Sequence, residues 1–255
     1  MNNKNYFKKS LKYISYVIGI IAFVLIYEIL AFTCFKTQMD EFFTNLNNSF
    51  ILISDINTLK ALGYTFLMLI FSVLISFFLA IILGSISGYY KTIYNLLSPT
   101  ISVLKSMPLI GLILIFISKF KYYEIIVNFT VIFPIIYYQI AKFTFDTRKE
   151  YENVLRIEGK NNPIEVLFKV IYPLNKDKIF LILLQVIGVG IKTEIMAETF
   201  GYSTYKYGIG KLIYMSYSNA MYKTMNNYIT LSIVIALIID CTIYITKSRI
   251  IKTKK

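Results

Sequence analysis

The sequence of 255 residues contains no histidine, no tryptophan, two cysteines and five prolines. Without histidine, the chain lacks the commonest metal ligand and the usual acid–base group at neutral pH, and two cysteines alone cannot build a zinc site. It also contains no Gly-x-x-x-x-Gly-Lys-Ser/Thr phosphate-binding loop, so it cannot hydrolyse ATP by that mechanism. These absences predict no metal site and no cofactor, and they leave little chemistry for an enzyme.

Charged residues are also scarce, at 16% of the chain, whereas 56% of the residues are hydrophobic. A helix needs about 20 apolar residues to cross the hydrocarbon core of a bilayer. Because the apolar runs are continuous and do not alternate with polar residues, they favour helices over a membrane barrel. The sequence therefore predicts an all-α polytopic membrane protein with about six transmembrane helices, at residues 13–35, 62–86, 101–117, 125–143, 179–197 and 229–246.

The net charge of +13 is unevenly distributed between the predicted loops. With the N-terminus placed in the cytoplasm, 18 basic residues fall in inner segments and 7 in outer segments. This positive-inside pattern predicts a multi-pass protein of the plasma or inner membrane with both termini in the cytoplasm. Membrane topology thus explains the charge without nucleic-acid binding. Cys34 and Cys241 would lie on opposite sides of the membrane, which argues against a disulfide.

Four segments are expected along the chain. They are a cytoplasmic basic leader at residues 1–12, a first transmembrane helix with its outer connection at 13–59, a core of five transmembrane helices at 60–246, and a cytoplasmic basic tail at 247–255. The core is interrupted by a charged connection, residues 146–176, between the fourth and fifth predicted spans of the chain.

Within that connection, residues 150–173 predict a short helix, a turn at Gly159 and a second short helix that ends before Pro173. Mixed charges around an apolar patch that includes Leu155 favour docking into a protein groove over lying in the membrane interface. The residues expected to form this docking loop are Glu152, Asn153, Val154, Leu155, Arg156, Glu158, Gly159, Pro163 and Pro173.

Small residues recur at every fourth position of the second predicted span. This spacing places them on one helical stripe, where another backbone can approach closely. The stripe serves either general helix packing or the wall of a translocation path, and in both cases it should be buried in protein. Its members are Ser72, Ser76, Ala80, Gly84 and Gly88.

Two predicted spans carry polar features that could belong to a translocation path or gate. Ser98-Pro99 starts the third span, and Pro108 predicts a break or kink soon afterwards, with Lys105 either lining a polar path or snorkelling to the interface. The fifth span holds Lys192, Glu194 and Glu198. Lys192 lies about 160° from Glu194 on an ideal helix, so it needs a partner elsewhere. For Glu198, the alternative is an interface carboxylate at a helix end.

The order of these features resembles the permeases of binding-protein-dependent ABC importers, particularly the nitrate/sulfonate/taurine type. In that family a cytoplasmic coupling loop reads Glu-Ala-Ala, three residues, Gly, and later an apolar pair and Pro. Here Asn153-Val154-Leu155 replaces Glu-Ala-Ala, and Pro173 lies one residue further from Gly159 than is usual. The other matches, spread over residues 60–245, are Pro99, Pro108, Phe133-Pro134, Ala197-Glu198 and Gly208-Ile209-Gly210.

The resemblance implies the membrane-spanning permease subunit of an ATP-binding-cassette importer. Its implied partners are cytoplasmic ABC ATPase subunits, an extracytoplasmic solute-binding protein and a second copy of the chain. The implied solute is a sulfonate-, taurine- or nitrate-like anion or a thiamine-precursor-like compound. Two alternatives stay open: a secondary transporter, which tends to show internal repeats, and a membrane-embedded enzyme, for which only Lys192, Glu194 and Glu198 offer chemistry.

Overall fold

The computed structural model describes residues 41–158, 162–201 and 207–252, together with the isolated positions 19, 22 and 26. The chain forms two units, Met1–Asp55 and Ile56–Lys255. In the first unit, α2 (Glu41–Ile53) is the described helix. Most of the first predicted span, with Cys34, and the whole basic leader lie outside the described residues.

The second unit is built from long helices, and within the described residues every secondary-structure element is helical. Four helices are long and apolar enough to span a membrane, at Ile56–Tyr89, Tyr123–Glu150, Pro163–Phe200 and Tyr222–Thr246. The all-α membrane fold class predicted from the sequence is confirmed. The elements are α3 (Ile56–Tyr89), α4 (Lys91–Ser106), α5 (Leu109–Ile117), α6 (Tyr123–Glu150), α7 (Glu152–Ile157), α8 (Pro163–Val166), the π-helix η1 (Leu167–Ile171), α9 (Tyr172–Phe200), α10 (Ile209–Ser218) and α11 (Tyr222–Lys252).

The third predicted span is a pair of helices, α4 and α5, bent by 89° at their junction. Pro108 is the residue before α5 and has extended backbone angles, which confirms the predicted break. Pro99 does not start the span, as its position suggested, but lies inside α4. The helix begins earlier, at Lys91, because the polar residues before Pro99 are helix-compatible although they are not apolar enough to mark a span.

Pro173 does not end the second loop helix, contrary to the sequence prediction. The chain is helical from Pro163 through η1 to Phe200. A proline inside an α-helix clashes with the carbonyl four residues earlier. Here the preceding turn is π-helical, and the Tyr172 amide donates to the Leu167 carbonyl, five residues back. This wider turn accommodates Pro173 near the start of α9 without ending the helix.

The core of the second unit lies where α3 packs along α6. All five residues of the small-residue stripe on α3 are buried. A Cβ atom at Gly84 would lie 3.1 Å from the Tyr137 carbonyl oxygen, and one at Gly88 would collide with the Ala141 carbonyl and Thr144. The small side chains thus permit this close approach. Leu74 and Phe78 of the same helix are 58% and 66% exposed, as expected of positions that contact lipid.

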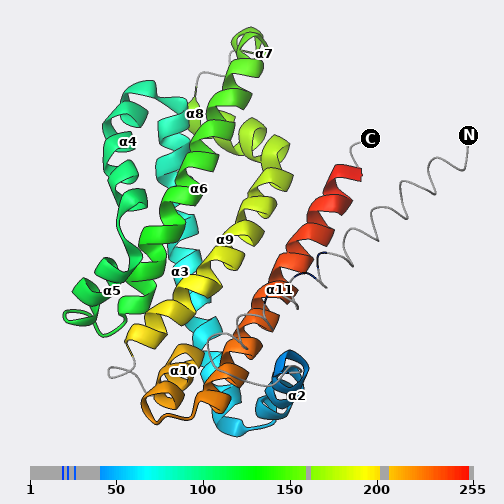
Figure 1. The fold of residues 1–255 in the computed structure, drawn as a ribbon. Coiled ribbons are helices and arrows are strands. Elements are labelled where there is room, and N and C mark those ends of the chain that lie inside the picture. Colours follow the sequence, from blue (N-terminus) through cyan, green and yellow to red (C-terminus); the bar gives the residue numbers. More distant parts are fainter. Residues whose placement is uncertain are drawn as a thin grey trace, which may run out of the picture. The chain divides into compact units, whose positions relative to one another are not determined.

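Different short helices lie at the two ends of this unit. Helices α7 and α8 lie at one end, and α10 lies at the other, beside the C-terminal part of α9 (Figure 1). We refer to them as the α7 end and the α10 end.

Candidate functional site

Glu198 joins three helices at the α10 end. The residue is 3% exposed, and its carboxylate accepts hydrogen bonds from the Thr65 hydroxyl of α3 at 2.7 Å and the Gly210 amide of α10 at 3.0 Å. Thr65 in turn accepts the Ile209 amide at 3.2 Å. Ile209 and Gly210 open α10. The carboxylate therefore satisfies amides at the start of α10, where the helix dipole favours a negative charge.

The Gly-x-Gly pair is explained by this contact. Gly208 has a φ of +137°, in the region that favours glycine, and a Cβ atom there would lie 2.7 Å from the Glu198 carboxyl carbon. A Cβ atom at Gly210 would collide with the Ile195 carbonyl of α9. Both glycines let the start of α10 approach Glu198.

Glu194 is fully buried between α9 and α6. The Asn128 side-chain amide donates to its Oε2 atom. One turn further along α9, the Tyr123 hydroxyl donates to the Ala197 carbonyl at 3.0 Å. Glu124, also on α6, is fully buried as well. Among the described residues, no group of three or more His, Cys, Asp or Glu side chains is arranged to hold a metal ion.

The two carboxylates predicted for a path or gate are therefore placed at internal helix contacts. Glu198 lies near the end of α9 but is buried and not exposed at an interface, and its role in a gate stays a prediction. The sequence analysis missed their partners Thr65 and Asn128. A weak signal existed, since each is a polar residue within an otherwise apolar run, but neither carries a charge.

Lys192 lies on a different face of α9, and its ammonium group lies 3.4 Å from Asp240 of α11. The prediction that Lys192 has its partner outside its own helix is confirmed. The two side chains are 61% and 50% exposed. Asp240 was missed, although it is a single acidic residue within the last apolar run. Gly188 keeps the helices close here, because a Cβ atom there would lie 3.0 Å from Asp240 Oδ1.

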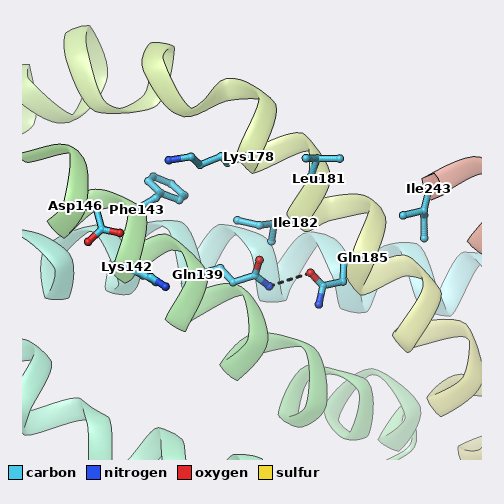
Figure 2. Close-up of a pocket in the computed structure, with 9 residues that line it drawn as sticks. All are labelled: Gln139, Lys142, Phe143, Asp146, Lys178, Leu181, Ile182, Gln185 and Ile243. Carbon is cyan, nitrogen blue, oxygen red and sulfur yellow. Dashed lines mark hydrogen bonds between the residues drawn. The ribbon is translucent and has the colours of Figure 1, made fainter. Parts of the chain in front are cut away.

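The same face of α9 carries further polar side chains toward the α7 end. Lys178, Gln185 and Lys192 are exposed and recur every seven residues, which places them on one side of the helix. Gln139 of α6 donates to the Gln185 side-chain oxygen at 3.2 Å. A cavity of about 540 Å³ opens around this pair, between α6 and α9 and beside Ile243 of α11 (Figure 2).

Lys105 and Pro108 lie at the bend between α4 and α5. Lys105 is exposed, and its ammonium group lies 5.9 Å from the centre of the Tyr138 ring. The Tyr138 hydroxyl lies 2.7 Å from the Ser102 hydroxyl and donates to the Ser98 carbonyl at 3.2 Å. The surroundings of Lys105 are therefore aromatic and hydroxylic, unlike the acidic partner of Lys192.

Side-chain contacts fix the ends of the charged connection between α6 and α9. Asn175 of α9 donates to the Thr147 hydroxyl of α6 at 2.8 Å and to the Ile171 carbonyl at 2.8 Å. The Arg148 guanidinium donates to the Tyr89 carbonyl and lies 4.0 Å from the centre of the Tyr89 ring. The Asn162 side chain accepts the Ile164 amide and so caps α8. Gly159 lies outside the described residues.

Leu155 was expected in an exposed apolar patch, but the structure buries it. The side chain is 9% exposed and belongs to the same core cluster as Val166 and Ile171. Its burial follows from the helical period, which turns Leu155 inward while its neighbours in α7 point outward. The exposed apolar side chains of α7 are Val154 and Ile157, at 48% and 87% exposure.

Exposed apolar side chains continue beyond α7. Ile164 and Phe168 are 66% and 67% exposed. They are flanked by an ion pair, in which Lys169 donates to Glu165 at 2.7 Å. We call the set Val154, Ile157, Ile164 and Phe168 the α7-end apolar set.

Comparison with known families identifies the protein class. The family model of binding-protein-dependent transport system inner membrane components matches residues 80–252. The match covers more than half of the chain, and the protein belongs to this family of ABC importer permeases. It is thus a multi-pass membrane subunit that takes part in transport, while ATP hydrolysis belongs to a separate subunit. The family match does not favour the alternative of a secondary transporter.

Solved structures show the same fold. One crystal form of the MetNI methionine ABC transporter in inward-facing conformations has 16% sequence identity and a TM-score of 0.57, covering 83% of this chain and 99% of that one. A second crystal form has 15% identity and a TM-score of 0.54, covering 76% and 98%. Comparison with curated proteins found no match.

Proposed function

We propose that this chain forms the translocation path of an ABC importer as one half of a homodimer, and that the connection around α7 is its docking site for a cytoplasmic ATPase. The observation that carries the docking proposal is Ile157, an apolar side chain 87% exposed on a helix that Leu155 anchors to the core. Apolar side chains rimmed by charges fit a groove on a protein partner. The ATPase would therefore contact the α7-end apolar set.

The basic residues near this connection support its placement on the cytoplasmic side. Arg148 and Lys149 occupy the last turn of α6, and Arg156 the last turn of α7. Basic residues close to the ends of spans are retained on the cytoplasmic side. Under this orientation the α10 end faces outward, toward the expected solute-binding protein.

The homodimer is supported by the polar face of α9. Exposed lysine and glutamine side chains at membrane depth are costly next to lipid tails. The face that carries Gln185 and Lys192 therefore needs a cover of protein or water. A second copy of the chain would supply the protein cover, and a path between the two copies would supply the water.

The proposed solute is a small anion of the sulfonate, taurine or nitrate kind, or a thiamine-precursor-like compound. The sequence resemblance described above supports these classes, and selection among them would rest largely on the solute-binding protein. The MetNI structures are described as those of a methionine transporter, and at 16% identity they support only the shared fold.

The docking proposal is tested by Ile157→Asp, which places a charge in the proposed contact without disturbing the core. With the ATPase coexpressed, we expect ATPase capture by the tagged chain to fall about tenfold or more, at unchanged yield of the membrane-inserted chain. Met221→Asp is the matched control, because Met221 is 57% exposed and precedes α11 at the other end of the unit. It should capture the ATPase normally. Equal capture by the two variants would refute the docking site.

A further inference from the structure

The cavity between α6 and α9 has a lining that is unusual for two membrane helices. Polar and charged side chains face it from both helices, whereas α11 contributes one apolar side chain. Figure 2 shows the charged groups gathered toward one end of the cavity, and further along it the glutamine pair, which bridges α6 and α9. The lining residues are Gln139, Lys142, Phe143, Asp146, Lys178, Leu181, Ile182, Gln185 and Ile243.

The charges in this lining favour an anion. Lys142 and Lys178 contribute two positive charges and Asp146 one negative charge, so the lining is net positive. Lys142 and Asp146 belong to α6, and Lys178 belongs to α9. A concave site with one excess charge between low-dielectric walls concentrates ions of the opposite sign. The two lysines therefore attract an anion that enters between the helices.

The glutamine pair supplies hydrogen-bonding groups in the same cavity. Because Gln139 Nε2 donates to Gln185 Oε1, the Gln185 NH₂ group is not used in this hydrogen bond. An NH₂ group donates and does not accept, so it suits an oxyanion. Lysine ammonium groups and amide NH₂ groups together match the oxygen atoms of a sulfonate, phosphate or carboxylate.

We propose that this cavity is a binding site for a small oxyanion, in which Lys142 and Lys178 balance the charge and Gln185 donates a hydrogen bond. Its place on a translocation path rests on the proposed function, whereas its charge preference does not. The oxyanion group belongs either to a transported solute or to the headgroup of an anionic lipid, since both present the same chemistry.

The charge preference can be measured without knowing the solute. Leu181→Cys places a thiol in the cavity while leaving the polar lining intact, in the full-length chain with Cys34→Ser and Cys241→Ser, reconstituted in phosphatidylcholine vesicles. The probes are two methanethiosulfonates, one carrying a sulfonate and the other a trimethylammonium group. The readout is the ratio of their reaction rates, divided by the same ratio for Ile157→Cys, an exposed position outside the cavity.

Changing the charges in the lining should shift this ratio in both directions. Lys142→Gln combined with Lys178→Gln should lower the preference for the anionic reagent about tenfold, because both attractive charges are removed. Asp146→Asn should raise it about threefold. Misfolding cannot produce shifts of opposite sign. A ratio that stays within twofold in both variants would overturn the anion site.

Competition identifies the source of the oxyanion. If sulfate slows the reaction of the anionic reagent in phosphatidylcholine vesicles, and only while Lys142 and Lys178 are present, the result supports a soluble anion. Slowing that requires added phosphatidylglycerol supports a lipid headgroup. If neither sulfate nor phosphatidylglycerol slows the reaction, no oxyanion binds and the proposal fails. ATPase capture is a separate measurement. A negative result for the anion site therefore does not refute the docking site, and a negative result for the docking site does not refute the anion site.

Discussion

Two faces of helix α9 carry charged side chains in opposite surroundings. Glu194 and Glu198 are buried, and their carboxylates accept hydrogen bonds from α6, α3 and α10. Lys178 and Lys192 are exposed on another face, together with Gln185. A charge inside an apolar run is therefore not evidence of a translocation path by itself. What separates the two faces is burial, since neighbouring helices enclose the two carboxylates but leave the paired side chains of the other face open to water or a second chain.

The difference has an energetic consequence. Removing a partner from a buried polar contact leaves the other group unsatisfied at a cost of about 1–3 kcal/mol, and more for a charged group. An exposed ion pair is typically worth about 0–1 kcal/mol. Substitutions at the α10 end should therefore act on stability, whereas those on the exposed face of α9 should act mainly on what enters the cavity.

The largest expected effect is that of Gly210→Ala. The added Cβ atom would collide with the Ile195 carbonyl and lie 2.6 Å from the Thr199 amide nitrogen, and both are backbone atoms of α9. Backbone cannot move aside without separating α9 from α10, so we expect a loss of stability of about 3 kcal/mol. The measurement is thermal unfolding of the purified chain in detergent. Gly63→Ala serves as the control, because a Cβ atom there meets nothing within 4 Å.

A smaller loss is expected at Glu198. Glu198→Ala removes the acceptor of the Thr65 hydroxyl and the Gly210 amide, and should cost about 2–3 kcal/mol. Glu198→Gln retains one side-chain oxygen of the same reach and should cost less. Thr65→Val in each background completes a double-mutant cycle, and we expect a coupling of about 1 kcal/mol with Glu198. Zero coupling would mean that Glu198 does not contribute through this contact.

Long apolar runs were sufficient to predict the fold class, since a span is specified by local composition. The break at Pro108 was also predictable, because proline acts on its own turn. Pro173 behaved differently, since the π-turn before it removes the clash that would end a helix. Nothing in the residues 167–171 alone distinguishes that turn from an α-helical one.

The site was less predictable than the fold because burial depends on distant parts of the chain. Leu155 and Ile157 are two apolar residues in one short helix, yet one is buried and the other exposed. The contact of Glu198 with Thr65, 133 positions earlier, could not be read from the sequence around either residue. The uncharged lining residues Gln139 and Gln185 carried no signal that separated them from other polar residues in apolar runs.

The smallest effect on stability is expected for the exposed pair on α9. Asp240→Asn should change the stability by at most about 1 kcal/mol, because Lys192 and Asp240 are 61% and 50% exposed and water can solvate the remaining ammonium group. The measurement is thermal unfolding in lipid nanodiscs, where the chain has its membrane neighbours. The exchanged variant, Lys192→Asp with Asp240→Lys, should match the parent. If this face contacts lipid instead of water or a second copy, the unpaired lysine should cost several kcal/mol, and the exchange should restore most of it. That outcome would remove the distinction between the two faces of α9, since both would then depend on pairing within the chain.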